Sequence, residues 1–170
     1  KNKITGIIGA KGRGKSWYAR RLFAQAKRGI VFDSMREYEG YPTTAELGEF
    51  CQYLLSLEKT RFKIVFQPAF GERRLYQFRQ IARSALLLQD VQLHLEEIDQ
   101  YGCTALQMEP ELDEIVQTGR HFGVDLVYTT RRLAEVSRTL TSQTDEFVCF
   151  EFHEPRATQA LAARIGGDLA

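Results

Sequence analysis

Short runs of β-branched and aromatic residues alternate along this chain of 170 residues with longer segments of helical composition. The runs predict strands at Ile4–Ile8, Ile30–Phe32, Phe62–Phe66, Val91–Leu95, Val124–Thr130 and Phe147–Phe152. The segments between them predict helices at Lys15–Lys27, Thr44–Glu58, Glu72–Leu88, Glu109–Phe122 and Arg156–Ala163. This alternation is typical of an α/β fold in which helices cover both faces of a mainly parallel sheet.

Two prolines support the predicted helix starts. Pro42, in the stretch "PTT", is expected to open the second helix, and Pro110, in "EPE", is expected to open the fourth. The leucines Leu54-Leu55 and Leu86–Leu88 fit helices that are buried against the sheet. The sequence shows no internal repeat, low-complexity tract or linker, so we expect one compact domain over residues 1–170.

The turn between the first strand and the first helix is rich in glycine and cations. Gly9, Gly14, Lys15 and Ser16 complete the pattern G-x-x-x-x-G-K-[ST] of a P-loop, or Walker A motif. Glycines let backbone N–H groups turn inward around a phosphate, and the following helix points its positive end at the same anion. The alternative is a glycine-rich turn with a solvated lysine, but a strand before the motif and a helix after it favour nucleotide binding.

The motif predicts a site for ATP and Mg²⁺. Lys15 would reach the β- and γ-phosphates, and the Ser16 hydroxyl would bind the metal. The residues expected to surround the nucleotide are Gly9, Ala10, Lys11, Gly12, Arg13, Gly14, Lys15, Ser16 and Trp17.

A P-loop needs a carboxylate at the end of a neighbouring strand, and "VQLHLEEIDQY" offers a pair. Glu96 is interpreted as the Walker B acid that holds Mg²⁺ through water, and Glu97 as the base that orients and deprotonates the attacking water. Aspartate is usual at the first of these positions, so Glu96 is a departure. The alternatives are that the pair only solvates a strand end, or that Asp99 is the acid.

The composition is that of an ordinary globular protein, with 44% hydrophobic and 26% charged residues. No apolar run approaches the roughly eighteen residues of a membrane span, and the N-terminal segment does not resemble a signal peptide. The net charge of +1 means that a nucleic-acid surface would need local clustering of cations. Cys51, Cys103 and Cys149 lack metal-like spacing and indicate reduced thiols in the cytoplasm.

The histidines are also assigned no metal. His94, His121 and His153 are each taken as single histidines without a Cys or His partner nearby, so each is expected to be packed or hydrogen-bonded.

The C-terminal half carries a distinctive order of segments. They are Gly119–Gly123 (GRHFG), a strand at Val124–Tyr128, Thr129–Arg132 (TTRR), and Ser142–Asp145 (SQTD) before the run Phe147–Phe152. Together with the P-loop and the Glu-Glu strand end, this order resembles the HerA/FtsK superfamily of DNA-pumping ATPases. The likeness is greatest to the small genome-packaging ATPases of viruses with an internal membrane. The resemblance covers nearly the whole chain and implies a RecA-like P-loop NTPase core of the ASCE type.

The resemblance implies catalytic roles for Arg120 and Arg131 beside Glu97. Arg120 matches the arginine finger, which enters a neighbouring subunit's active site and neutralises charge on the transferring phosphoryl group. Its alternative is an exposed arginine at a helix end, where the helix dipole favours a cation. Arg131 stands where the family has a glutamine sensor, and Leu133 replaces the family's proline. An arginine at this position would contact the γ-phosphate, in cis or across a subunit boundary, or change how hydrolysis is sensed.

A further basic stretch, "GERRLYQFRQIAR", is a candidate for DNA contact. It interleaves arginines with aromatic residues: Arg73, Arg74, Tyr76, Phe78, Arg79 and Arg83. Guanidinium groups on such a helix would bind phosphates without reading sequence. The alternative is a solvated amphipathic surface.

We therefore expect an ATP hydrolase that forms a homo-oligomeric ring and couples hydrolysis to movement of double-stranded DNA. Packaging of a viral genome at the vertex of a capsid, in the host cytoplasm or the virion, is the favoured role. One alternative is a nucleotide-switched phage assembly or secretion subunit of the Zot-like kind. The other is a small nucleotide kinase, which shares the P-loop and the size but needs a basic lid and an acceptor-base pocket.

Overall fold

The computed structural model describes residues 3–57, 61–151 and 155–165 of the chain. Within these ranges a seven-stranded sheet has the order β3-β4-β2-β5-β6-β1-β7, and every neighbouring pair is parallel. The strands are β1 Ile4–Ile8, β2 Arg28–Phe32, β3 Thr43–Thr44, β4 Phe62–Phe66, β5 Val91–Leu95, β6 Val124–Thr130 and β7 Glu146–Cys149. The α/β class with a parallel sheet is confirmed.

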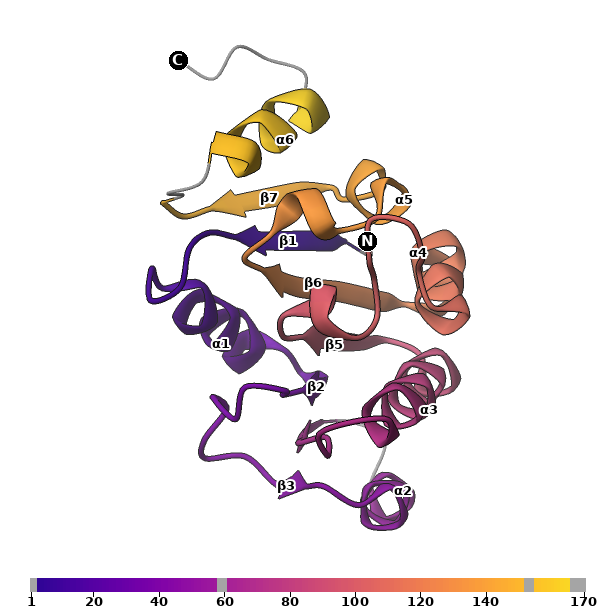
Figure 1. Cartoon of the computed structure of the whole chain (residues 1–170). Coiled ribbons are helices and arrows are strands. Elements are labelled where there is room, and N and C mark those ends of the chain that lie inside the picture. Colours follow the sequence, from indigo (N-terminus) through magenta and orange to yellow (C-terminus); the bar gives the residue numbers. More distant parts are fainter. Residues whose placement is uncertain (1–2, 58–60, 152–154, 166–170) are drawn as a thin grey trace.

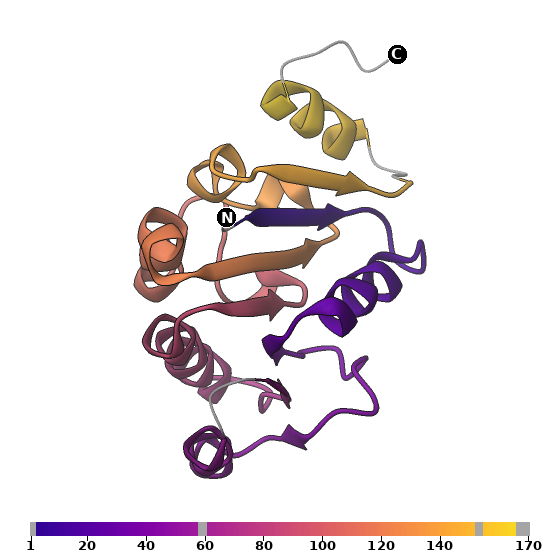
Figure 2. The same cartoon turned by 180° about the vertical axis from the view of Figure 1, so that it is seen from behind.

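Helices cover both faces of the sheet (Figures 1 and 2). The α-helices are α1 Lys15–Gln25, α2 Leu47–Ser56, α3 Arg73–Leu88, α4 Pro110–Phe122, α5 Arg138–Ser142 and α6 Pro155–Ile165. Two short 3-10 helices, η1 Ile98–Gln100 and η2 Leu133–Glu135, follow β5 and β6. α1 lies on one face of the sheet, and α2, α3 and α4 lie on the other. α6 lies beside β7 at the sheet edge.

Alternate residues of each strand pack into the two layers. In β2, Ile30 and Phe32 join the core under α2, α3 and α4, which includes Phe50. Val31 points the other way and packs with Phe23 of α1. Because successive side chains of a strand point to opposite faces, a strand covered on both sides must be apolar at nearly every position. The short unbroken apolar runs of the sequence have this cause.

The carboxyl ends of the central strands meet at one edge of the sheet. β6 lies between β5 and β1, with Ile8 paired to Thr130 and Leu95 paired to Tyr128. The chain segments that follow these strands therefore come together, as loops do at the carboxyl ends of parallel strands. The P-loop follows β1, the two glutamates follow β5, and Arg131 follows β6. The topology assembles a site from these three segments.

The prediction for the segment around Pro42 is wrong. Thr43–Thr44 forms the edge strand β3 beside β4, and α2 begins at Leu47 instead of Thr44. The Pro42 carbonyl oxygen accepts a hydrogen bond from the Val65 N–H at 2.9 Å. A proline is tolerated here because an edge strand does not need every N–H group for its ladder.

Other boundaries moved by a few residues. β2 begins at Arg28 because Arg28 already pairs with β4 and Gly29 pairs with both β4 and β5, and α1 ends at Gln25. β7 covers Glu146–Cys149, so the predicted strand over Phe147–Phe152 starts one residue earlier and ends sooner. Phe152 lies outside the described residues. α4 begins at Pro110, as the "EPE" stretch predicts.

The expectation that the leucine groups are buried is correct only in part. Leu86 is buried, but Leu87 is 83% exposed and Leu55 is 86% exposed. Consecutive helix residues point about 100° apart, and the buried face of α3 already includes Ala85 and Leu86, so Leu87 lies beyond it.

The remaining sequence expectations concern cysteine, histidine and membrane segments. The cysteines are free thiols. His94 is buried and hydrogen-bonded, His121 is exposed in the last turn of α4, and His153 lies outside the described residues. In the described part of the chain, no helix is long and apolar enough to cross a membrane.

Gly29 of β2 is fixed by close packing against α1. A Cβ atom at Gly29 would lie 2.4 Å from Cε2 of Phe23. The Phe23 ring cannot swing away, because it is fully buried among Tyr38, Tyr41 and His94. We therefore expect Gly29→Ala to lower the free energy of unfolding by about 2 kcal/mol, measured by urea denaturation.

The matched control is Gly48→Ala in α2, where a Cβ atom would meet nothing within 4 Å. Alanine favours the helix over glycine, so this variant should be stabilised by roughly 0.5–1 kcal/mol. Equal unfolding free energies for the two variants would contradict the packing argument.

Candidate nucleotide-binding site

The loop between β1 and α1 has a backbone that suits glycine. Gly9 and Gly14 have φ angles of 155° and 99°, and Gly14 is the N-cap of α1. A Cβ atom at Gly9 would also lie 2.6 Å from Cβ of Phe150. With these angles the loop can curl around an anion while α1 presents its positive end to it.

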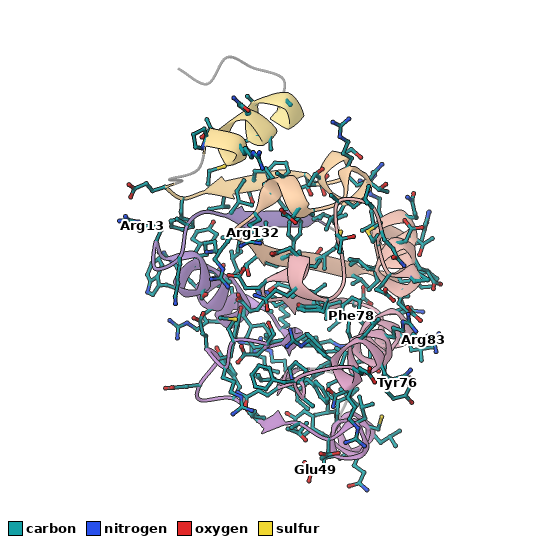
Figure 3. All side chains as sticks on the ribbon, in the orientation of Figure 1. Arg13, Glu49, Tyr76, Phe78, Arg83 and Arg132 are labelled. Atoms are coloured by element: carbon teal, nitrogen blue, oxygen red, sulfur yellow. The ribbon has the colours of Figure 1, made fainter. Side chains whose placement is uncertain are left out.

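The chain after β7 supports this loop. The Phe150 N–H donates to the Ile8 carbonyl oxygen, and the Ala10 N–H donates to the Glu151 carbonyl oxygen, both at 2.8 Å. The Glu151 carboxylate lies 3.1 Å from Nη1 of Arg13, which projects outward from the loop in Figure 3. Sequence reasoning placed residues 150–151 in a predicted strand but missed this support, because they are distant in sequence from the loop.

Lys15 lies in the first turn of α1 and bends back toward the loop. Its side chain is buried, and Nζ donates to the Ala10 carbonyl oxygen at 3.1 Å. Burial lowers the pKa of Lys15, and the opposing charge of Glu97 partly offsets this effect. Water stabilises the ammonium group of an exposed lysine, and a phosphate would stabilise the buried ammonium group of Lys15 in its place. The position therefore fits a nucleotide phosphate.

The other P-loop residues surround an open pocket of about 410 Å³. Gly12, Gly14, Ser16 and Trp17 line it together with Lys15 and with residues of the segment after β2. Ser16 is partly buried and Lys11 is exposed. Trp17 is 57% exposed, with Cζ of Arg21 5.6 Å from the centre of its ring. A larger cavity of about 830 Å³ lies between η2, α5 and α6 and is lined by no residue of the P-loop.

Glu97 lies opposite Lys15 at the end of β5. Its Oε1 is 3.9 Å from Nζ of Lys15, and its Oε2 is 3.0 Å from Nε of Arg131. Among the described residues Oε2 has no hydrogen-bond partner despite this short distance, so the contact with Arg131 is an ion pair without hydrogen-bond alignment. The buried Glu97 carboxylate is therefore held by its ion pairs with Lys15 and Arg131, and its Oε2 can still accept a hydrogen bond.

The backbone at Glu97 is in the left-handed region, with φ 51° and ψ 57°. For a non-glycine residue this conformation costs about 1 kcal/mol or more and persists only where other contacts fix it. The fixing contact is a hydrogen bond of 2.9 Å from the Glu97 N–H to Oγ1 of Thr129. Thr129 thus directs the Glu97 side chain toward Lys15.

Glu96 is almost fully buried and points away from Glu97. Its Oε1 accepts a hydrogen bond from the Tyr38 hydroxyl at 3.0 Å, and its Oε2 accepts one from the Thr129 hydroxyl at 2.7 Å. Each carboxylate oxygen has a second lone pair, so these bonds leave capacity for a water-mediated metal contact. Sequence reasoning identified Glu96 but not Tyr38, which lies in the loop after β2.

Burial raises the pKa of Glu96 to about 7, against the opposing effect of its hydroxyl partners. Tyr38 also lies 3.3 Å from Nδ1 of His94, whose Nε2 contacts Oε1 of Gln92 at 2.7 Å. Burial lowers the pKa of His94 to about 3, so the ring is neutral. If Nε2 of His94 carries the proton, it donates a hydrogen bond to Gln92, and Nδ1 accepts one from the Tyr38 hydroxyl. A protonated Glu96 can then donate a hydrogen bond to the Tyr38 oxygen. With Glu96 neutral, every member of this network has a hydrogen-bond partner.

Asp99 lies outside this cluster. It is in η1 and accepts a hydrogen bond of 2.8 Å from the Thr130 hydroxyl. The Thr130 hydroxyl in turn accepts a hydrogen bond from the Arg132 N–H, so Asp99 helps to fix the turn after β6. Between the two acids proposed from the sequence, Glu97 is the one in contact with Lys15.

Arg120 lies at the opposite edge of the sheet from the P-loop. It is in the last turn of α4, just before β6 begins, and lines a small pocket with Lys3 and Ile4 at the start of β1. Its exposed guanidinium is 4.0 Å from Asp145. The strands extend about 3.3 Å per residue, so the length of β6 separates Arg120 from the P-loop of its own chain. Arg120 is not part of the cluster around Lys15.

The basic stretch of α3 does not form one DNA-facing surface. Phe78 is fully buried in the core, and Figure 3 shows it on the inner side of α3, with Tyr76 and Arg83 outside. Arg79 Nε lies 2.8 Å from Glu109, and Arg83 Nη2 lies 2.7 Å from Glu111. These pairs join α3 to the start of α4. The expectation of DNA contact fails for Phe78, and Arg79 and Arg83 are engaged within the fold.

Comparison with known proteins identifies the fold. No protein-family model matches the chain, and no curated protein is similar to it in sequence. The genome packaging NTPase B204 from Sulfolobus turreted icosahedral virus 2, in complex with AMP, superposes with a TM-score of 0.71. The two chains are 20% identical, and the match covers 96% of this chain and 82% of B204. The complex of B204 with ATP-gammaS gives the same TM-score at 16% identity.

Two further solved structures are similar. The cytoplasmic domain of EssC has a TM-score of 0.59 and 16% identity, over 96% of this chain and 34% of EssC. The N-terminal domain of zonular occludens toxin from Neisseria meningitidis has a TM-score of 0.54 and 14% identity, over 87% of this chain and 77% of that structure. The chain therefore has the P-loop NTPase fold. The predicted resemblance to packaging and HerA/FtsK-type ATPases is confirmed at the level of the fold.

The raised pKa of Glu96 predicts how stability depends on pH. Between pH 4.5 and about 7 the folded chain holds a proton that the unfolded chain has released, so stability falls as pH rises through this window. The full effect is roughly 3 kcal/mol. Glu96→Gln cannot ionise and does not lose this stability. The unfolding free energy of the variant minus that of the parent should therefore increase by up to this amount from pH 4.5 to 8.

Urea denaturation without nucleotide or Mg²⁺ measures this difference at each pH, and the subtraction removes groups that titrate in both proteins. A gap between the two proteins that stays constant from pH 5 to 8 would show that Glu96 is already ionised at the lower pH.

Proposed function

We propose that this chain binds ATP with Mg²⁺ in the loop Gly9–Trp17 and hydrolyses it. The observation that carries the proposal is the position of Glu97, 3.9 Å from the buried Lys15 and at the carboxyl end of the strand two places from β1. A carboxylate beside a P-loop lysine can accept a proton from a water that attacks the γ-phosphate. The described residues fit the nucleotide, since the loop has glycine angles, an inward lysine and an open pocket.

The proposed roles follow from position. Lys15 binds the β- and γ-phosphate oxygens, and Ser16 together with Glu96 holds the metal, Glu96 through water. A Mg²⁺ ion held by these residues would supply positive charge to offset the negative charge that develops on the phosphate during transfer. Glu97 orients the water and takes its proton. Arg131 binds the γ-phosphate, a contact that would draw it away from Glu97 and leave that carboxylate free to act as a base.

We further propose that the ATPase is a homo-oligomeric ring that moves double-stranded DNA, as a packaging motor at the vertex of a viral capsid. The fold shared with B204, a genome packaging NTPase, supports this role. The location of such a motor would be the host cytoplasm or the virion. A second candidate is a nucleotide-switched assembly or secretion subunit, favoured by the fold shared with the N-terminal domain of zonular occludens toxin.

A ring also gives Arg120 a target. Because Arg120 lies at the edge of the sheet opposite its own P-loop, it cannot serve its own site as an arginine finger. In a ring, the P-loop edge of one subunit can face the Arg120 edge of the next. Arg120 then neutralises charge on the phosphoryl group in trans.

Two substitutions separate phosphate binding from hydrolysis. Lys15→Ala should weaken ATP binding and abolish most turnover, because it removes the cation from the γ-phosphate. Glu97→Gln should bind ATP within a few-fold of the parent and lose about 10²–10⁴ in kcat, since an amide cannot take the proton. Titration of a fluorescent ATP analogue and steady-state phosphate release, each with and without duplex DNA, measure both.

Asp99→Asn is the matched control, and it should retain turnover. Normal turnover by Lys15→Ala would overturn the role of Lys15. Normal turnover by Glu97→Gln together with an inactive Asp99→Asn variant would overturn the role of Glu97. Stimulation of hydrolysis by DNA is expected of the motor and not of the switched assembly subunit. DNA stimulation is also not expected of a nucleotide kinase, which would transfer phosphate to a nucleoside monophosphate.

Mixed rings test the direction of Arg120. Arg120→Ala should bind ATP like the parent and lose about 10³–10⁵ in kcat. Mixing it with Glu97→Gln should restore part of the activity, because a Glu97→Gln subunit can still donate its arginine to a neighbour that retains Glu97. The measurement is phosphate release by the mixture against each variant alone. Mixed assemblies, verified by native mass spectrometry, that stay inactive would contradict action in trans.

A further inference from the structure

An exposed aromatic ring contacts two arginines, one on the loop that follows β2 and one in the first turn of α3. Phe70, between β4 and α3, is 73% exposed. Cζ of Arg36 lies 6.0 Å from the centre of its ring, and Cζ of Arg74 lies 5.5 Å from it. We call Arg36, Phe70 and Arg74 the arginine–phenylalanine cluster. Since β2 and β4 run parallel to β1, the loops that carry Arg36 and Phe70, and the start of α3 that carries Arg74, lie at the same sheet edge as the P-loop.

The loop that carries Phe70 is braced from within. The Gln77 side chain is buried, accepts a hydrogen bond from the Ala69 N–H at 2.9 Å and donates one to the Ala45 carbonyl oxygen at 3.2 Å. The turn closes through a 3.1 Å hydrogen bond from the Arg74 N–H to the Gly71 carbonyl oxygen. The exposed ring therefore stands on a fixed base.

The loop that carries Arg36 is also fixed. Arg36 has a φ of 57°, in the left-handed region that a long side chain rarely adopts. The Asp33 carboxylate accepts hydrogen bonds from the N–H groups of Glu37 at 3.0 Å and Tyr38 at 3.1 Å. Asp33 is fully buried, so these bonds hold the strained turn in place.

The cluster keeps its positive charge. An aromatic ring orients a guanidinium group without neutralising it. Among the described residues, no carboxylate lies within 4.0 Å of the guanidinium group of Arg36 or Arg74, so neither forms an ion pair. By contrast, Arg79 and Arg83 of the same region are paired with Glu109 and Glu111. Both guanidinium groups of the cluster therefore retain donors for an anion from outside the chain.

We propose that the arginine–phenylalanine cluster binds the phosphodiester backbone of duplex DNA, with Arg36 and Arg74 contacting phosphates and Phe70 holding both guanidinium groups extended. This inference rests on the proposed DNA-dependent function. Contacts to phosphates carry no sequence information, as a motor that moves along any sequence requires. Arg36 also lines the nucleotide pocket with Lys15 and Ser16, so one loop touches both ligands.

The test measures binding of a fluorescein-labelled duplex by fluorescence anisotropy, in a non-hydrolysable ATP analogue and over a series of salt concentrations. The double variant Arg36→Gln/Arg74→Gln should bind about tenfold or more weakly. Its plot of log affinity against log salt should be shallower by about 1.8, because each lost phosphate contact removes about 0.9 from the slope. Phe70→Leu, which keeps both charges, should weaken binding with little change of slope.

The matched control is Arg61→Gln/Arg138→Gln, which removes the same charge from exposed positions before β4 and β7, at the other edge of the sheet. It should bind DNA like the parent. If the control and the cluster variant lost the same affinity and the same salt-dependence slope, the loss would be caused by the change in net charge. This result would overturn the inference. Tighter binding of a single-stranded oligonucleotide than of the duplex would also overturn it, since base stacking on Phe70 would then be the cause.

Two outcomes separate this inference from the proposed function. If DNA stimulates hydrolysis by the parent and by the cluster variant equally, the surface is wrong and the motor stands. If the parent hydrolyses ATP but neither binds DNA nor responds to it, the motor fails and the surface fails with it. Loss of ring assembly in the cluster variant, seen by native mass spectrometry, would assign the surface to a neighbouring subunit and contradict DNA contact.

Discussion

A buried carboxylate held between two cations is the interaction on which the site depends. Glu97 lies 3.9 Å from Lys15 and 3.0 Å from Arg131, and each of the three residues follows a different strand or loop of the central sheet. A buried charge without partners is strongly unfavourable, and removal of one partner from such a group typically costs about 3–5 kcal/mol. The two cations therefore fix the glutamate, and the parallel order β5-β6-β1 fixes the cations.

The second glutamate is held by different means. Glu96 has hydroxyl partners from Tyr38 and Thr129 in place of cations, and burial raises its pKa to about 7. Thr129 binds both glutamates, with its hydroxyl oxygen accepting from the Glu97 N–H and donating to Glu96. Adjacent residues of one strand end thus have different environments: Glu97 lies beside two cations, and Glu96 lies among hydroxyl groups. This difference supports the roles proposed above, proton transfer for Glu97 and the metal's water shell for Glu96.

The sequence was informative where the signal is local. Apolar runs mark strands such as Val91–Leu95 because a strand covered on both faces must be apolar, and the P-loop is visible because its backbone requires glycine at fixed spacing. Long-range contacts could not be read in this way. Nothing in the sequence indicates that Tyr38 reaches Glu96, or that Phe150 packs on Gly9. The edge strand β3 was missed because two residues carry no period, and the charge of Arg79 and Arg83 gave no sign of their partners.

The P-loop lies at one edge of the sheet and Arg120 at the other, so the proposed catalytic role of Arg120 requires a neighbouring subunit to complete each site. The most direct test is the rate of ATP hydrolysis per subunit across a dilution series with duplex DNA, with the assembly mass determined in parallel by light scattering. The rate per subunit should rise with protein concentration and level off where the mass reaches that of the ring. A rate per subunit that is the same for monomer and ring would contradict the account.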